Sequence, residues 1–165
     1  MEQQPSKNDK NVAALMHIST FCKFLFPLGI FVAPLILWTI HKDKPFVHEH
    51  GRQAINFQLS ILLYTLAIGL LCLPFFVFFA VDFVSLVETL DHHVHHVGYN
   101  DITNLSGYFI LFGIVAILLF GIFVFELYAI ISATVKANKG ELYQYPFCIS
   151  FINSAETIQK KTSSS

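Results

Sequence analysis

Long apolar runs without any charged residue dominate the chain. Residues 24–41, 53–81 and 102–125 contain no Lys, Arg, Asp or Glu. A helix needs roughly 20 apolar residues to cross a bilayer, so these runs are of transmembrane length. Residues 75–79 read Phe-Phe-Val-Phe-Phe, a sequence that lipid accepts and a water-soluble surface does not. The pattern predicts an all-α fold, a polytopic membrane helical bundle of about four transmembrane helices.

The first apolar region, residues 12–40, is interrupted near its middle. Pro27 and Gly29 favour a turn there, because proline removes a backbone donor and breaks or kinks a helix. Lys23 would lie near the membrane centre if the region were a single span, which is costly. We therefore predict two short helices, 12–26 and 30–41, that form a Pro/Gly hinged hairpin with Lys23 reaching towards a surface. A single bent span is the alternative.

The remaining pattern predicts two longer helices. One runs over 47–73, with Pro74 expected to end or kink it before the apolar run continues to about residue 90. The other runs over 105–138, with Asn104 or Ser106 as its N-cap and Gly140 as its stop signal. Residues 147–152 are expected to form a short interfacial helix. We divide the chain into a disordered polar N-terminus (1–11), one membrane domain (12–152) and a polar tail (153–165).

Charge is scarce and its distribution predicts an orientation. Charged residues make up 13% of the chain and the net charge is −1, which offers no basic surface for nucleic acid. Lys and Arg gather in 41–52 and near both termini, and 82–105 has none. Because cytoplasmic loops are enriched in these residues, we expect both termini and the 41–52 loop in the cytoplasm. The three cysteines, Cys22, Cys72 and Cys148, lie in or beside apolar segments and suggest no disulfide framework.

A histidine cluster is the most conspicuous local motif. The run Asp91-His92-His93-Val94-His95-His96 places His92 and His96 on one face if it is helical. Imidazoles bind zinc, copper or nickel, and Asp91 and Asp101 could assist. The hypothesis is a metal site formed by His92, His93, His95 and His96, and the alternative is an exposed polar loop.

Three polar residues are candidates for a role within the membrane: Glu126, Asn56 and Asp82. A carboxylate in lipid is costly, so Glu126 is expected to be neutral and bonded to a helix neighbour, or else to take part in ion or proton transfer. Asn56 is expected to bond across to another helix, and Arg52 to meet lipid phosphate.

One combination of motifs resembles a known family. Pro34-Leu35-Ile36-Leu37-Trp38 is followed by His50-Gly51-Arg52-Gln53-Ala54-Ile55-Asn56-Phe57-Gln58, and later by Lys139-Gly140-Glu141 and Tyr145-Pro146. Over residues 12–152 this resembles the Tic20-like (DUF4870) family of small bacterial membrane proteins. The resemblance implies four membrane helices in a bacterial inner membrane and a motif on the cytoplasmic face, comprising His50, Gly51, Arg52, Asn56, Gly140, Tyr145 and Pro146.

The sequence favours a protein without enzymatic activity or cofactor. It has no nucleophile elbow, phosphate loop or paired-carboxylate motif. We expect a multi-pass module in the lipid bilayer that assembles with a protein partner or with itself, translocon-like by resemblance. The alternatives are a small ion or solute transporter that uses Glu126 and a metal-responsive protein that uses the histidine cluster.

Overall fold

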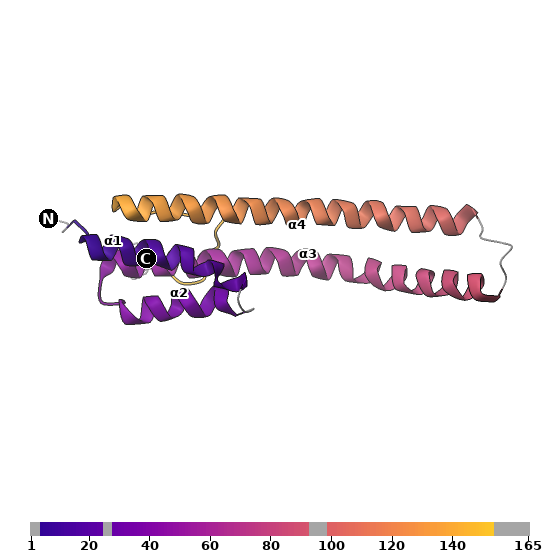
Figure 1. Cartoon of the computed structure of the whole chain (residues 1–165), viewed down its shortest axis with the longest axis horizontal. Coiled ribbons are helices and arrows are strands. Elements are labelled where there is room, and N and C mark those ends of the chain that lie inside the picture. The colour runs from indigo at the N-terminus through magenta and orange to yellow at the C-terminus, as the bar shows by residue number, and fades with distance from the viewer. Residues whose placement is uncertain (1–3, 25–27, 93–98, 154–165) are drawn as a thin grey trace, which may run out of the picture. The chain divides into compact units, whose positions relative to one another are not determined.

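A computed structural model describes residues 4–24, 28–92 and 99–153. In these residues it contains only helices and irregular segments, which confirms the all-α prediction. The elements are α1 (Lys7–Ser19), the 3-10 helix η1 (Thr20–Phe24), α2 (Gly29–Ile40), α3 (Pro45–His92) and α4 (Tyr99–Lys139) (Figure 1). The chain divides into unit 1, Met1–Leu62 with Phe125–Ser165, and unit 2, Leu63–Val124.

Helix α1 begins with a capping box. The Ser6 hydroxyl accepts from the Asp9 backbone N–H, and the Asp9 carboxylate accepts from the Ser6 N–H, both at 3.2 Å. This exchange satisfies donors that a helix start leaves free. Residues 7–11, expected in the polar N-terminus, are therefore helical. The small residues Ala13 and Ala14 of α1 pack on Ala137 of α4, where small side chains allow a close helix approach.

The first apolar region forms two short helices joined through η1. Helices α1 and α2 pack against each other within unit 1, in place of one long span. Helix α1 ends at Ser19, earlier than predicted, and the chain tightens into η1. Helix α2 contains Pro34, which is fully buried. Pro27, the proline expected at the hinge, lies outside the described residues.

Helix α3 begins at Pro45, where a proline costs no helical hydrogen bond. It continues through Pro74 to His92, so Pro74 does not end the helix, and of the two expected effects only a kink is left open. Proline in a membrane helix is tolerated where neighbouring groups or small local adjustments satisfy the freed carbonyl. In unit 2 the rings of Phe79 and Phe112 meet edge to face, with centroids 5.4 Å apart.

Helix α4 starts earlier than predicted and ends as predicted. It begins at Tyr99, so neither Asn104 nor Ser106 is its N-cap. It ends before Gly140, whose positive φ of 83° suits glycine at a helix end. The N–H groups of Gly140 and Glu141 donate to the carbonyls of Ala137 and Lys136, both at 3.0 Å.

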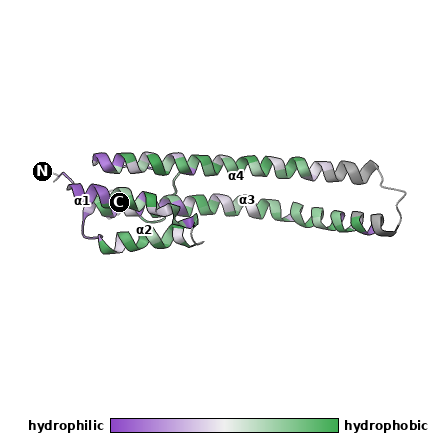
Figure 2. Ribbon diagram, viewed as in Figure 1, coloured by the Kyte–Doolittle hydropathy of each residue, from purple (hydrophilic) through white to green (hydrophobic). Residues whose placement is uncertain are grey.

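Among the residues that the structure describes, two helices, and not four, are long and apolar enough to cross a membrane. They are Pro45–Ser85 within α3 and Ser106–Lys139 within α4. Hydropathy colouring shows both as predominantly apolar, together with α2 (Figure 2). Helix α2 has 12 residues, so it rises only about 18 Å and cannot cross a hydrocarbon core of about 30 Å. The prediction of about four transmembrane helices is therefore corrected to two spans with two shorter helices.

Candidate functional site

A buried ion pair lies within unit 1. The Lys23 ammonium of η1 lies 2.5 Å from one carboxylate oxygen of Glu126 on α4. Both side chains are largely buried, with 20% and 4% of their surfaces exposed. The partner of Glu126 is therefore Lys23, a basic side chain 103 residues away, and not the helix neighbour that was expected. The same contact corrects the expectation that Lys23 reaches towards a surface.

A chain of three buried side chains lies in the same unit. The Tyr145 hydroxyl lies 2.8 Å from His17 Nδ1, and His17 Nε2 lies 2.8 Å from His50 Nδ1. The exposed fractions of His17, His50 and Tyr145 are 0%, 1% and 6%. If the tyrosine donates to His17, then His17 donates to His50, and His50 Nε2–H is left as a buried donor without a hydrogen-bond partner among the described residues. One proton arrangement thus supplies a donor and an acceptor for both contacts without a charge.

Burial keeps this chain neutral. Desolvation, with the nearby His50 as a second cause, lowers the pKa of His17 to about 3. Burial also raises the pKa of the Tyr145 hydroxyl well above its usual value. Helix α1 and the C-terminal segment, which carry these two groups, lie outside the two candidate spans. His17 and Tyr145 therefore serve as neutral hydrogen-bond partners at neutral pH.

We expect unit 1 to lose stability as the pH falls below about 6.5. Between pH 6.5 and 3 the unfolded chain binds a proton at His17 that the folded chain excludes, so unfolding is favoured as the pH drops. Thermal unfolding in mild detergent, recorded from pH 7.5 to 4, measures this dependence. His17→Gln removes the titrating group and is expected to flatten the profile over that window. An equally steep profile in His17→Gln would assign the pH dependence to another group.

The C-terminal segment, residues 141–153, is fixed along α3 without forming a helix, so the predicted helix at 147–152 is wrong. The side chains of Arg52, Asn56 and Ser60 follow one another at intervals of four residues and so share one face of α3. Asn56 donates to the Ile152 carbonyl and accepts from the Ile152 N–H, both at 2.9 Å. The Ser60 hydroxyl accepts from the Ile149 N–H at 2.8 Å.

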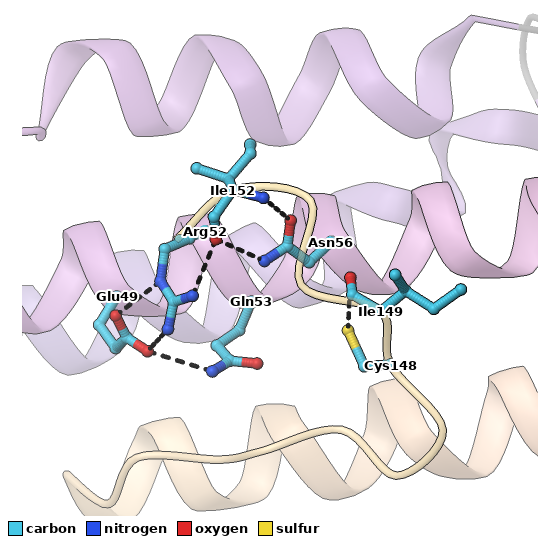
Figure 3. Close-up of polar contacts among 7 residues, drawn as sticks. All are labelled: Glu49, Arg52, Gln53, Asn56, Cys148, Ile149 and Ile152. Atoms are coloured by element: carbon cyan, nitrogen blue, oxygen red, sulfur yellow. Dashed lines mark hydrogen bonds and ion pairs between the residues drawn. The ribbon is translucent and has the colours of Figure 1, made fainter. Parts of the chain in front are cut away.

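Arg52 connects the helix start to the same segment. Its guanidinium pairs with Glu49, and one of its nitrogens donates to the Ile152 carbonyl at 2.9 Å (Figure 3). Gln53 also donates to Glu49, at 3.1 Å. The expected contacts of Arg52 with lipid phosphate and of Asn56 with another helix are therefore corrected: both bind the C-terminal backbone. Side chains of α3 thus supply the hydrogen bonds that a helix would have supplied to this segment.

We expect Asn56→Leu to release the C-terminal segment from α3. The substitution leaves the Ile152 N–H without its partner, at a cost of about 1–3 kcal/mol. Burial raises the pKa of the Cys148 thiol in the intact protein, which slows its alkylation. Faster maleimide labelling of Cys148 in a chain with Cys22→Ser and Cys72→Ser therefore reports release. Gln53→Ala is the control, because the hydrogen bond of Gln53 goes to Glu49 and not to the C-terminal segment. Unchanged labelling of Cys148 in Asn56→Leu would contradict the expectation.

The other predicted residues have separate positions. Gly51 lies against the Trp38 ring, where an added Cβ would come within 2.7 Å. Pro146 is exposed beside Tyr145. In unit 2, Asp82 accepts a hydrogen bond from Tyr108 at 2.9 Å. The side chains of the histidine cluster lie outside the described residues. Elsewhere in the described chain, no three His, Cys, Asp or Glu side chains form a metal-binding group.

Sequence reasoning did not identify His17 and did not pair Lys23 with Glu126. The signal for each was weak: a single polar residue within an otherwise apolar run. Their partners lie more than 100 residues away, at Tyr145 and Glu126, so no local spacing reveals them.

Comparison with known proteins identifies the family. No curated protein and no solved structure matches the chain. A family model, that of the MamF/MmsF magnetosome magnetite crystal formation proteins, matches residues 8–152. This match overturns the assignment to the Tic20-like (DUF4870) family, whose supporting motifs, including residues 50–58 and 139–146, fall inside the matched region. The chain therefore belongs to the MamF/MmsF magnetosome magnetite crystal formation protein family.

Proposed function

We propose that this protein supports magnetite crystal formation as a non-catalytic component of the magnetosome membrane. The family match over residues 8–152 carries the proposal. The two apolar helices Pro45–Ser85 and Ser106–Lys139 support a membrane location. The internal pairing of the conspicuous polar residues supports a structural role for them. Lys23 and Lys44 each pair with a carboxylate of a distant segment, and Arg52 pairs with Glu49 on its own helix.

The proposed role is to assemble with a protein partner or a second copy in that membrane. The pairing of Glu126 with Lys23 removes the free carboxylate on which the transporter alternative depended. Because the Glu126 carboxylate is paired, we favour assembly with other proteins over transport as the role of this small membrane chain.

Deletion and complementation in a magnetite-forming bacterium test the proposed role. We expect loss of the protein to change the number or size of magnetite crystals, measured by electron microscopy, and the wild-type chain to restore them. In-cell crosslinking of the restored protein should capture a second protein or a second copy. Crystals unchanged by the deletion would contradict the role in crystal formation, and repeated recovery of uncrosslinked monomer would contradict assembly.

A second proposal concerns the histidine cluster. The charge bias predicts that the 82–105 loop faces away from the cytoplasm. His92, His93, His95 and His96 would there bind iron, the metal of magnetite, since imidazole suits iron as well as zinc. Replacing all four by Asn should weaken Fe²⁺ binding to the reconstituted chain. If the variant binds Fe²⁺ with unchanged affinity, the histidine cluster is an exposed polar loop and not a metal site.

We predict that Asn8 and Asn153 face the cytoplasm. Two spans place both ends of the chain on one side, and the Lys and Arg bias indicates that this side is cytoplasmic. In a Cys-free background, Asn8→Cys and Asn153→Cys should resist an impermeant maleimide in intact cells and react after lysis. Ser106→Cys, at the opposite end of α4, is the control and should stay unlabelled after gentle lysis that leaves the magnetosome membrane sealed. Labelling of Ser106→Cys together with protection of Asn8→Cys after such lysis would show the opposite orientation.

A further inference from the structure

The outer face of α2 is an uncharged apolar surface. Residues 24–41 contain no charged side chain. The aliphatic side chains on this outer face have exposed fractions from 38% at Val32 to 66% at Ile40. A continuous apolar surface of this kind marks contact with a membrane or with another protein. It is formed by Leu28, Val32, Leu35, Ile36 and Ile40.

The length of α2 matches one leaflet. Its 12 residues rise about 18 Å, slightly more than half of a hydrocarbon core of about 30 Å. At its N-terminus Gly29 lies against the Cys22 backbone, where an added Cβ would come within 2.3 Å of the carbonyl oxygen. The close approach keeps η1 and the start of α2 in a tight reversal. At the other end, the chain becomes polar at His41, Lys42 and Asp43.

The one charge near the N-terminal end of α2 is compensated. Lys23 lies just before the reversal, and an uncompensated ammonium there would oppose entry into lipid. Its ion pair with Glu126 removes that obstacle, because the two charges cancel within unit 1. At the opposite end, the Trp38 indole donates to His48 at 3.0 Å, which suits an aromatic side chain at the membrane–water interface.

The distribution of apolar exposure over unit 1 favours lipid over a protein partner. A partner covers one patch, whereas acyl chains surround a surface. Exposed apolar side chains of unit 1 lie on α2 and also on every neighbouring element: Leu15 and Ile18 of α1, Ile131 and Val135 of α4, and Leu142 and Phe147 of the C-terminal segment.

We propose that the outer face of α2 inserts into the acyl chains of a single leaflet, with Leu28 deepest and Ile40 near the headgroups. An apolar helix held in one leaflet adds area to that leaflet alone. Binding of this kind is sensitive to curvature, so the protein should favour membranes in which the α2 leaflet is convex. The inference rests on unit 1 and is independent of the proposed role in crystal formation.

Depth measurements in liposomes test the insertion. Nitroxide labels are placed one at a time at Leu28, Ile36 and Lys42 of a Cys-free full-length chain, with Ile117 of unit 2 as the reference within a span. We expect oxygen to relax the labels at Leu28 and Ile36, with Leu28 deeper, and a water-soluble nickel complex to relax the label at Lys42. Relaxation of the Ile36 label by nickel would place α2 in water. Protection of the Ile36 label from both oxygen and nickel would mean that a second copy or another protein covers it. Nickel relaxation and full protection of this label would each overturn the proposal.

Curvature sorting provides the second measurement. In membrane tubes drawn from giant vesicles, molecules with the α2 leaflet outward should be enriched in the tube relative to the vesicle. Leu35→Asn with Ile36→Asn should reduce the enrichment to a ratio of about one, because polar side chains cannot enter the leaflet. Leu35→Val with Ile36→Val keeps the surface apolar and should sort like the wild type. Absence of wild-type enrichment, or equal loss in both variants, would overturn the curvature preference.

Discussion

Lys23→Met is expected to destabilise unit 1 by about 3–5 kcal/mol, the usual cost of removing one partner from a buried ion pair. The Glu126 side chain is 4% exposed, so water cannot replace the lost ammonium. Its second oxygen, Oε1, makes no hydrogen bond to any described residue, which leaves the carboxylate dependent on Lys23. The measurement is thermal unfolding of the full chain in mild detergent, with helicity as the signal.

The double variant Lys23→Met with Glu126→Leu separates charge compensation from packing. Replacing both partners by apolar groups of similar size is often neutral, so the double variant should recover most of the stability lost in Lys23→Met. Glu126→Gln should be less damaging than Lys23→Met, because the new amide oxygen can still accept a hydrogen bond from the Lys23 ammonium. If Lys23→Met unfolds at the wild-type temperature, the pair contributes nothing to stability.

Gly29→Ala is expected to cost about 3 kcal/mol, at the upper end of the usual range for overpacking. The added Cβ would lie 2.3 Å from the carbonyl oxygen and 2.6 Å from the carbonyl carbon of Cys22. Both are backbone atoms, so no rotation of a side chain relieves the overlap. The reversal between η1 and α2 must open, which a loss of thermal stability reports.

Gly69→Ala is the matched control for Gly29→Ala. Gly69 lies within α3, and an added Cβ there would meet nothing within 4 Å. Alanine is favoured over glycine in a helix by about 1 kcal/mol, so this variant should be neutral or slightly more stable. Equal losses in both variants would show that glycine flexibility matters in this chain, and not the contact with Cys22.

The local features of the fold could be predicted from the sequence. The apolar runs predicted the helical class, and Gly140 predicted the end of α4, because both depend on neighbouring residues only. The family could not be inferred correctly, since the motifs that suggested Tic20-like proteins occur within a region that matches another family.

The candidate site depended on contacts between distant segments. Tyr145 and His17 are 128 residues apart, and no periodicity connects them. The segment at 147–152 was predicted to be a short interfacial helix, but it is irregular, and its backbone groups find hydrogen-bond partners on another element. Asn56 and Ser60 supply those partners from α3, which only the structure reveals. The number of spans was overestimated for a different reason. Helix α2 is apolar enough to lie in a membrane, but with 12 residues it is too short to cross one.

The division of unit 1 into two sequence segments dictates the order in which the chain can fold. Residues 63–124, the whole of unit 2, are synthesised between the two segments. His17 and His50 are made early, but the Tyr145 hydroxyl that completes their buried chain emerges only after both long helices exist. Joining segments so far apart in the chain costs loop-closure entropy. This cost falls if α3 and α4 have already been inserted into the membrane as neighbours. Membrane insertion of the two long helices should therefore precede, and set the pace of, closure of the unit 1 core.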